Sequence, residues 1–143
     1  MSARVQSEYS TRELSKRTWP DFEKLFMKQG VVGDGWWCWC THHQRARSVP
    51  LIEEPRTRAE CAAKNRREKR ELVKKGCAHG VLVYAGGEPV GWCQYGSGDE
   101  FPRIESSPRY RRLGFEDGGE RLWRITCFVV DKEYRGVEWL VSG

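Results

Sequence analysis

Two cysteines and two histidines stand close together in the sequence, and thiolate and imidazole are ligands that suit zinc. They are Cys38, Cys40, His42 and His43. Their spacing argues against a zinc site, because alternate residues of an extended strand point the same way at steps of about 6.6 Å. Three ligands in such a row cannot all lie roughly 2.0–2.3 Å from one ion without a sharp turn. We therefore expect no metal, and we expect these residues to pack on the core with the neighbouring tryptophans.

Cysteine nucleophiles are the second chemistry to consider, and they need a neighbouring base and an accessible, electropositive setting. Cys93 and Cys127 lie in apolar, strand-like runs, while His79 begins another run. Nothing in the sequence links the histidine to either thiol. Because a reduced cysteine in such a run usually serves as a small hydrophobe, buried thiols are favoured over a cysteine hydrolase.

Basic residues are concentrated in the segment 56–75, which carries nine Lys and Arg against three Glu. This local charge of +6 accounts for all of the chain's net +5. Such a surface could bind nucleic acid or an acidic partner. We favour a solvated helix face with ion pairs such as Glu60–Lys64, Lys64–Glu68 and Glu71–Lys75. No aromatic residue lies among the basic ones, which argues against a base-stacking platform.

The composition is that of a globular chain, with 143 residues, 38% hydrophobic and 31% charged. This length suits one domain rather than two. No run approaches the roughly 18 apolar residues of a membrane span, so we expect no transmembrane segment. Residues 1–18 lack the apolar core of a signal peptide, and we expect a flexible leader there. The six cysteines are then expected to be reduced thiols in a cytoplasmic or nuclear protein.

Two helices are predicted in the first half of the chain. Thr18 is expected to cap the first, which has Pro20 and Asp21 in its first turn, an apolar face, and Gly30 at its end. The apolar face consists of Phe22, Leu25 and Phe26. The basic segment forms the second helix, because Thr57 and Glu60 have the spacing of a capping box and Gly76 follows the last charged turn.

Strands are predicted in the second half. Runs 80–84 and 89–95 flank Gly86-Gly87, which is typical of a hairpin, and 96–120 is expected to be a long functional or mobile loop. A third strand spans 122–130. Its period of two predicts one face shared by Trp123, Ile125, Cys127 and Val129, with Phe128 and Val130 making its end apolar on both faces. The fold class is therefore α+β, or α/β, with a mixed sheet.

The segment 128–136, in which the third strand ends and a turn with Arg and Gly follows, resembles the GNAT superfamily of N-acetyltransferases. The likeness is to small members that carry Trp-Cys-Trp-Cys and Gly-Trp-Cys-Gln, and it runs from about Trp19 to Gly136. The motifs that carry it agree in order along the chain. They are the tryptophan–cysteine run at 36–40, Ala78–Leu82, Glu88–Gln94, Phe101–Arg103 and Ile125–Val130.

The resemblance implies a mostly antiparallel, splayed sheet flanked by helices, with acetyl-CoA bound along its fourth strand. Phe128, Val129 and Val130 would hold the pantetheine arm and face the thioester carbonyl, and Arg135 and Gly136 would open the pyrophosphate loop. Backbone N–H groups at a helix N-terminus bind phosphates, and a donor aimed at the carbonyl would stabilise the tetrahedral oxyanion.

The chain departs from the family after Gly136. The family's loop reads Arg/Gln-x-x-Gly-x-Gly/Ala, but here Glu138 and Leu140 replace the small residues. A carboxylate there repels pyrophosphate, and a Cβ blocks its approach. We therefore expect a partial GNAT-like domain over 19–136, a divergent tail over 137–143, and a missing C-terminal helix and fifth strand. The strand at 122–130 would then be an exposed edge, open to dimerisation or aggregation.

These observations predict an acetyl-CoA-dependent N-acetyltransferase domain, impaired in this chain, that transfers acetyl to an unidentified amine. No catalytic base is assigned, and no metal cofactor is expected. The alternative is a non-catalytic module that binds nucleic acid or an acidic partner through the 56–75 helix. A fragment without a function of its own is a third reading.

Overall fold

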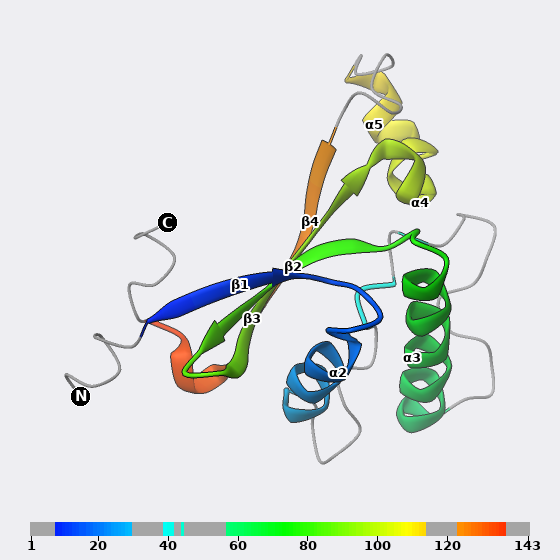
Figure 1. The fold of residues 1–143 in the computed structure, drawn as a ribbon. Helices are drawn as coiled ribbons and strands as arrows, with labels where there is room; N and C mark the ends of the chain where they lie inside the picture. Colours follow the sequence, from blue (N-terminus) through cyan, green and yellow to red (C-terminus); the bar gives the residue numbers. More distant parts are fainter. Residues whose placement is uncertain (1–7, 30–38, 42–43, 45–56, 114–122, 137–143) are drawn as a thin grey trace.

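A four-stranded antiparallel sheet and two main helices make up the described part of the chain (Figure 1). The computed structural model describes residues 8–29, 39–41, 44, 57–113 and 123–136. The strands, in the spatial order β1-β2-β3-β4, are β1 (Tyr9–Glu13), β2 (His79–Ala85), β3 (Glu88–Ser97) and β4 (Trp123–Val130). The helices are α2 (Trp19–Lys28), α3 (Arg58–Lys74), η2 (Gly98–Glu100), α4 (Pro102–Glu105), α5 (Pro108–Arg112) and η4 (Lys132–Tyr134). The α+β class is confirmed.

Strand β1 lies inside the predicted leader, and this prediction needs correction at residues 9–18. The strand pairs antiparallel with β2, from Tyr9 opposite Ala85 to Glu13 opposite Val81. The Thr18 hydroxyl, 2.8 Å from the Glu13 carbonyl oxygen, closes the following turn against the strand. The sequence of β1 is polar and mostly exposed, so it carries no apolar alternation that could reveal a strand. Residues 1–7 lie outside the described residues.

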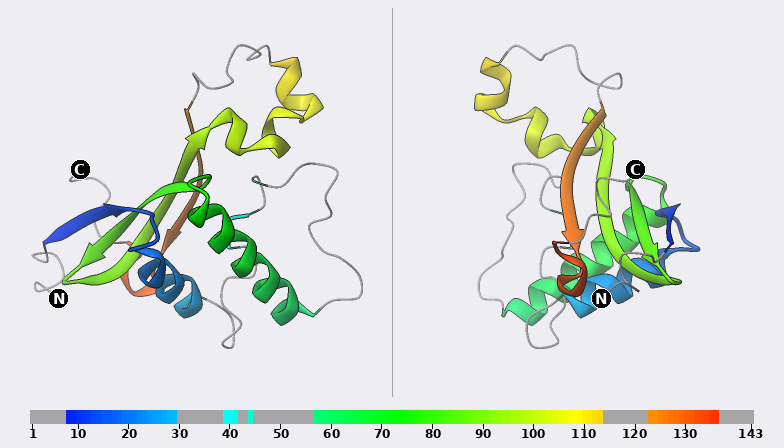
Figure 2. Two further views of the ribbon diagram at one scale, coloured as in Figure 1. Left: turned by 45° about the vertical axis from the view of Figure 1, so that its right-hand side comes forward. Right: turned by 90° about the vertical axis from the view of Figure 1, so that its left-hand side faces the viewer.

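Helices α2 and α3 lie side by side against one face of the sheet (Figures 1 and 2). The predicted apolar face of α2 is confirmed, because Phe22, Leu25 and Phe26 are all buried. The capping box of α3 is also confirmed. The Thr57 side chain accepts a bond from the Glu60 backbone N–H, and the Glu60 carboxylate accepts one from the Thr57 N–H.

Aromatic rings fill the space between the helices and the sheet. Phe22 lies 4.2 Å from Phe26 and 4.8 Å from Trp92 of β3, measured between ring centroids. Trp39 stacks on Phe26 at 5.4 Å. Gly80 of β2 lies beneath Trp92, and any Cβ at that position would overlap the indole ring. The glycine therefore allows the largest core side chain of β3 to lie flat on the neighbouring strand.

The predicted hairpin is confirmed, since Gly86 and Gly87 turn the chain between β2 and β3 with φ of +57° and +85°. The predicted long loop is only partly right. Residues 98–112 contain the three short helices η2, α4 and α5, which lie beyond the ends of β3 and β4 (Figure 1). Residues 114–122 lie outside the described residues.

The predicted faces of the third strand are only partly right, because Cys127 and Val129 share the core face but Trp123 and Ile125 do not. Register with β3 shifts between Gln94 and Tyr95, which leaves Thr126 as an extra residue between Ile125 and Cys127. Such a bulge reverses the side-chain alternation beyond it. Cys127 therefore packs against the core, with Val129, while three large side chains of β4 are exposed. They are Trp123 (58% exposed), Ile125 (64%) and Phe128 (63%).

Candidate functional site

One edge of β4 is open in the part of the chain that the structure describes, because β4 is the last strand of the sheet. On its other edge β4 pairs with β3, and Asp131 extends the ladder by donating its N–H to the Val90 carbonyl at 2.8 Å. Alternate residues of an antiparallel strand bond to the partner, so the backbone groups of Val130 and Phe128 point away from β3. Arg135 Nε lies 3.0 Å from the Val130 carbonyl oxygen, which agrees with that direction.

The turn after β4 is fixed to the end of α2 by a buried carboxylate. The Asp131 side chain, 1% exposed, lies 2.7 Å from Lys28 Nζ and accepts the Glu133 N–H at 2.9 Å. Burial by itself raises the pKa of Asp131, but the hydrogen bonds from Lys28 and the Glu133 N–H, together with the charge of Lys28, outweigh burial and hold that pKa below its ordinary 3.8. Hydrogen bonding to Asp131 in turn raises the pKa of Lys28 above 10.5.

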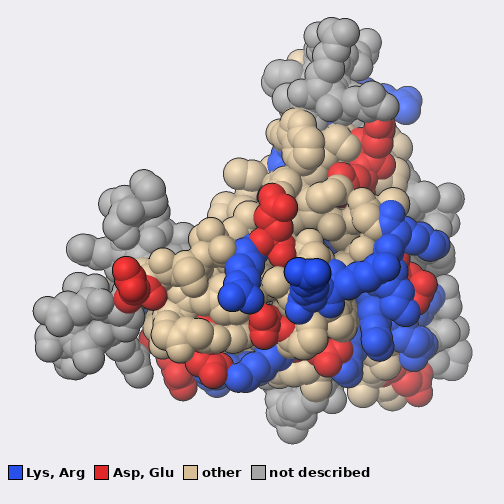
Figure 3. Space-filling model, in the orientation of Figure 1, with Lys and Arg blue, Asp and Glu red and all other residues tan. Residues whose placement is uncertain are grey.

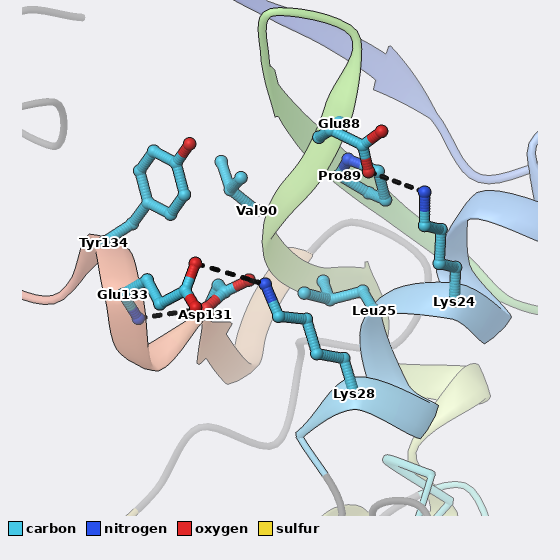
Figure 4. Close-up of a pocket in the computed structure, with 9 residues that line it drawn as sticks. All are labelled: Lys24, Leu25, Lys28, Glu88, Pro89, Val90, Asp131, Glu133 and Tyr134. Atoms are coloured by element: carbon cyan, nitrogen blue, oxygen red, sulfur yellow. Dashed lines mark hydrogen bonds and ion pairs between the residues drawn. The ribbon is translucent and has the colours of Figure 1, made fainter. Parts of the chain in front are cut away.

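Beside this ion pair lies a cavity of about 260 Å³ between α2, the β2–β3 hairpin and η4 (Figure 4). Its two lysines are both neutralised within the cavity. Lys24 Nζ lies 2.6 Å from Glu88, and Lys28 contacts Asp131 and, at 3.4 Å, Glu133. A phosphate group would compete with these carboxylates for the lysines, so the cavity is poorly suited to an anion.

All five residues that the sequence predicts for cofactor binding lie on β4 or the turn that follows it. Phe128 is exposed, Val130 is half-buried, and Val129 faces the core. Arg135 and Gly136 are exposed, and the φ of Gly136 is +82°, a conformation that favours glycine. The open edge at Phe128 is therefore followed along the same segment by a cation and a glycine. Residues 137–143, with Glu138 and Leu140, lie outside the described residues.

A histidine–carboxylate pair was missed by sequence reasoning. His79 Nδ1, at the start of β2, lies 2.8 Å from Oε1 and 2.9 Å from Oε2 of Glu100 in η2. The His79 ring also lies near Tyr95 and Trp123, with centroids 6.2 and 6.4 Å away. A carboxylate on one imidazole nitrogen fixes the ring's orientation, which is an arrangement suited to proton transfer. The hairpin at 86–87 was an available signal, because it brings the start of β2 beside the end of β3.

The metal and thiol predictions concern residues that are only partly described. Cys38, His42 and His43 lie outside the described residues. Within the described ranges, no group of three or more His, Cys, Asp or Glu side chains could hold a metal ion. Burial raises the pKa of the Cys93 thiol, and the nearby Cys127 raises it further. A raised pKa disfavours the thiolate that a cysteine nucleophile requires.

Basic side chains gather over α3 (Figure 3). Arg67, Arg70 and Lys74 are exposed along one stripe of the helix, and Lys74 lies 3.4 Å from Glu71. Lys69 is different, because it is completely buried and its Nζ lies 2.8 Å from Gln44 Oε1. Lys69, one of the nine basic residues of this segment, is therefore part of the core and does not contribute to the basic surface.

Among the described helices, none has the length and apolar character needed to cross a bilayer. Comparison with known proteins finds no matching family model, no similar curated protein and no similar solved structure. The function of the chain is therefore inferred from its motifs and from the geometry above.

Proposed function

We propose that this chain is an acetyl-CoA-dependent N-acetyltransferase domain of the GNAT type, which binds its cofactor along the open edge of β4. The observation that supports this is the outward backbone of Phe128 and Val130, next to Arg135 and Gly136. The pantetheine arm carries amide groups, which can pair with a free strand edge much as an added strand does. The Phe128 backbone offers this pairing, whereas the Val130 carbonyl oxygen is already bonded to Arg135 Nε. The remaining guanidinium nitrogens of Arg135 are suited to phosphate.

The reaction is a direct transfer from the thioester to an amine. The amine nitrogen attacks the carbonyl carbon, and the resulting tetrahedral oxyanion collapses with cleavage of the carbon–sulfur bond. The CoA thiolate leaves and takes up the proton that the amine nitrogen loses. The outward N–H of Phe128 is positioned to donate to an oxyanion at this edge, which would lower the barrier to attack. No residue is assigned as the base. A carboxylate at position 138 of the expected pyrophosphate loop would repel the pyrophosphate, so the proposed activity is weak.

The first experiment titrates the folded chain with acetyl-CoA and follows tryptophan fluorescence, since Trp123 of β4 is 58% exposed. Saturable quenching is expected in the wild type. Replacing Arg135 with glutamine should weaken binding about tenfold, the loss of one charge-assisted hydrogen bond. Lys132→Gln is the matched control, because Lys132 is an exposed cation three residues away and should change the affinity less than twofold.

Circular dichroism of each sample separates lost binding from lost folding. A folded wild type that shows no saturable response to acetyl-CoA would contradict the proposal. Equal weakening by Arg135→Gln and Lys132→Gln would contradict the assigned site, because the effect would then follow net charge alone.

A second candidate function is binding of a polyanion by the exposed stripe of Arg67, Arg70 and Lys74 on α3. Figure 3 shows Lys and Arg side chains gathered over this helix. If these three cations each contact a phosphate of duplex DNA, the logarithm of affinity should fall against the logarithm of salt concentration with a slope of about −2.7. A slope near zero, or no binding at low salt, would contradict this function. Acetyl-CoA binding at the β4 edge should not depend on the same three residues.

A further inference from the structure

We propose that Cys40 and Cys127 form a redox-active dithiol, which a small-molecule disulfide such as oxidised glutathione converts into an intramolecular disulfide bond. Their sulfur atoms are in contact, 2.6 Å apart, although the two residues are 87 positions apart in the sequence. Both are thiols in the structure. This inference is independent of the acetyltransferase proposal, because it needs neither acetyl-CoA nor an acceptor.

The backbone around Cys40 is held in an unusual conformation that directs its thiol toward β4. Trp39 and Cys40 have φ of +48° and +57°, a left-handed region that residues other than glycine seldom adopt. The surrounding core maintains it, because Trp39 is 1% exposed and stacks on Phe26. Such conformations persist where neighbouring contacts over-determine them, and they cluster at functional sites.

Gln94 of β3 holds the two cysteine segments together. Its Nε2 lies 3.1 Å from the Cys40 carbonyl oxygen and 3.1 Å from Thr126 Oγ1, next to Cys127. Lys69 Nζ lies 3.4 Å from the same Cys40 carbonyl. The β4 bulge completes the arrangement, because it turns Cys127 toward the core and therefore toward Cys40. Bonding the two sulfurs thus needs little movement of the backbone.

Exposure sets the order of the exchange. Cys40 is 3% exposed, whereas Cys127 is only partly buried, so an incoming disulfide reaches Cys127 first. The Cys127 thiolate attacks one sulfur of oxidised glutathione, forms a mixed disulfide and releases one glutathione thiolate. The Cys40 thiolate then attacks the Cys127 sulfur and releases the second. Two cysteine thiols lose two electrons to the glutathione disulfide, and their two protons pass to the two departing thiolates.

The test equilibrates the full chain with mixtures of reduced and oxidised glutathione, quenches with acid and alkylates the remaining thiols. In the wild type, intact mass should show two thiols protected with a loss of about 2 Da, the two hydrogens of one disulfide. Proteolytic mapping should show a peptide that joins Cys40 to Cys127. Cys127→Ser should abolish this product. Cys61→Ser is the matched control, because Cys61 is a buried thiol on α3 and its removal should leave the link intact.

Mapping in the wild type keeps the test decisive even if a serine variant fails to fold. The proposal is overturned if the wild type forms mixed disulfides at exposed Cys77 while Cys40 and Cys127 remain alkylatable. It is also overturned if the mapped link joins Cys127 to Cys93 instead of Cys40. A link that requires denaturant to form would overturn it too, because the folded arrangement would then not be its cause.

Discussion

Replacing Asp131 with asparagine tests how the turn after β4 is held in place. Asp131 is buried, and its carboxylate bonds to Lys28 of α2 and to the Glu133 N–H. Asparagine keeps an oxygen for the N–H but loses the charge. A hydrogen bond to a charged group contributes about 1.5–3 kcal/mol. Because Lys28 is 45% exposed and water can replace part of that bond, we expect a loss of about 1–2 kcal/mol in the free energy of unfolding.

The effect should depend on pH in a defined way. The pKa of Asp131 is lowered in the folded chain, so its stabilisation is present above the ordinary value of 3.8 and is lost as pH falls through the folded pKa. The pKa of Lys28 is raised, so its share is complete below 10.5 and is lost as pH rises through the folded pKa. The difference between wild type and variant should therefore be constant from about pH 5 to about pH 10.

Urea unfolding followed by tryptophan fluorescence measures this difference at several pH values. Glu133→Gln is the control, because Glu133 lies 3.4 Å from the same lysine but is 53% exposed, and its loss should cost less than about 0.5 kcal/mol. A variant as stable as the wild type at pH 7, or a difference that persists unchanged to about pH 2, would refute the reasoning.

Three further predictions follow from the same structure and sequence. Glu138→Gly should tighten acetyl-CoA binding in the fluorescence titration, by removing a carboxylate from the proposed pyrophosphate loop; unchanged affinity would count against that loop. Gly80→Ala should destabilise the fold by about 3 kcal/mol or more in urea unfolding, because the new Cβ overlaps Trp92; a loss below about 1 kcal/mol would show that the ring can move aside. Tyr84→Phe should cost about 0.5–1.5 kcal/mol, since the Tyr84 hydroxyl donates to Asp21 at 2.7 Å, and stability equal to wild type would show that the bond contributes nothing.

Elements with local signals could be predicted from the sequence. Helix α3 was located by its Thr57 capping box, and helix α2 by its apolar spacing. Thr18 occupies the predicted cap position of α2, but its side chain makes no capping bond and donates to the Glu13 carbonyl instead. The hairpin was located by Gly86-Gly87. In each case the determining interactions span only a few residues, such as the Thr57–Glu60 capping box. Strand β1 was not predicted, because a polar strand at the edge of a sheet takes its conformation from pairing with β2, about 70 residues later.

The candidate site likewise has parts that could be predicted from the sequence and parts that could not. Residue types alone were enough to predict an apolar strand that ends near Val130, with Arg135 and Gly136 after it. Packing of the sheet and helices places this strand at an edge that is open among the described residues, turns Cys127 toward Cys40 through a bulge, and brings Glu100 to His79. Sequence patterns could not reveal these features, because periodicity and capping act over one or two turns of chain. Strand order, register shifts and contacts between distant side chains arise only when the sheet and its helices pack together.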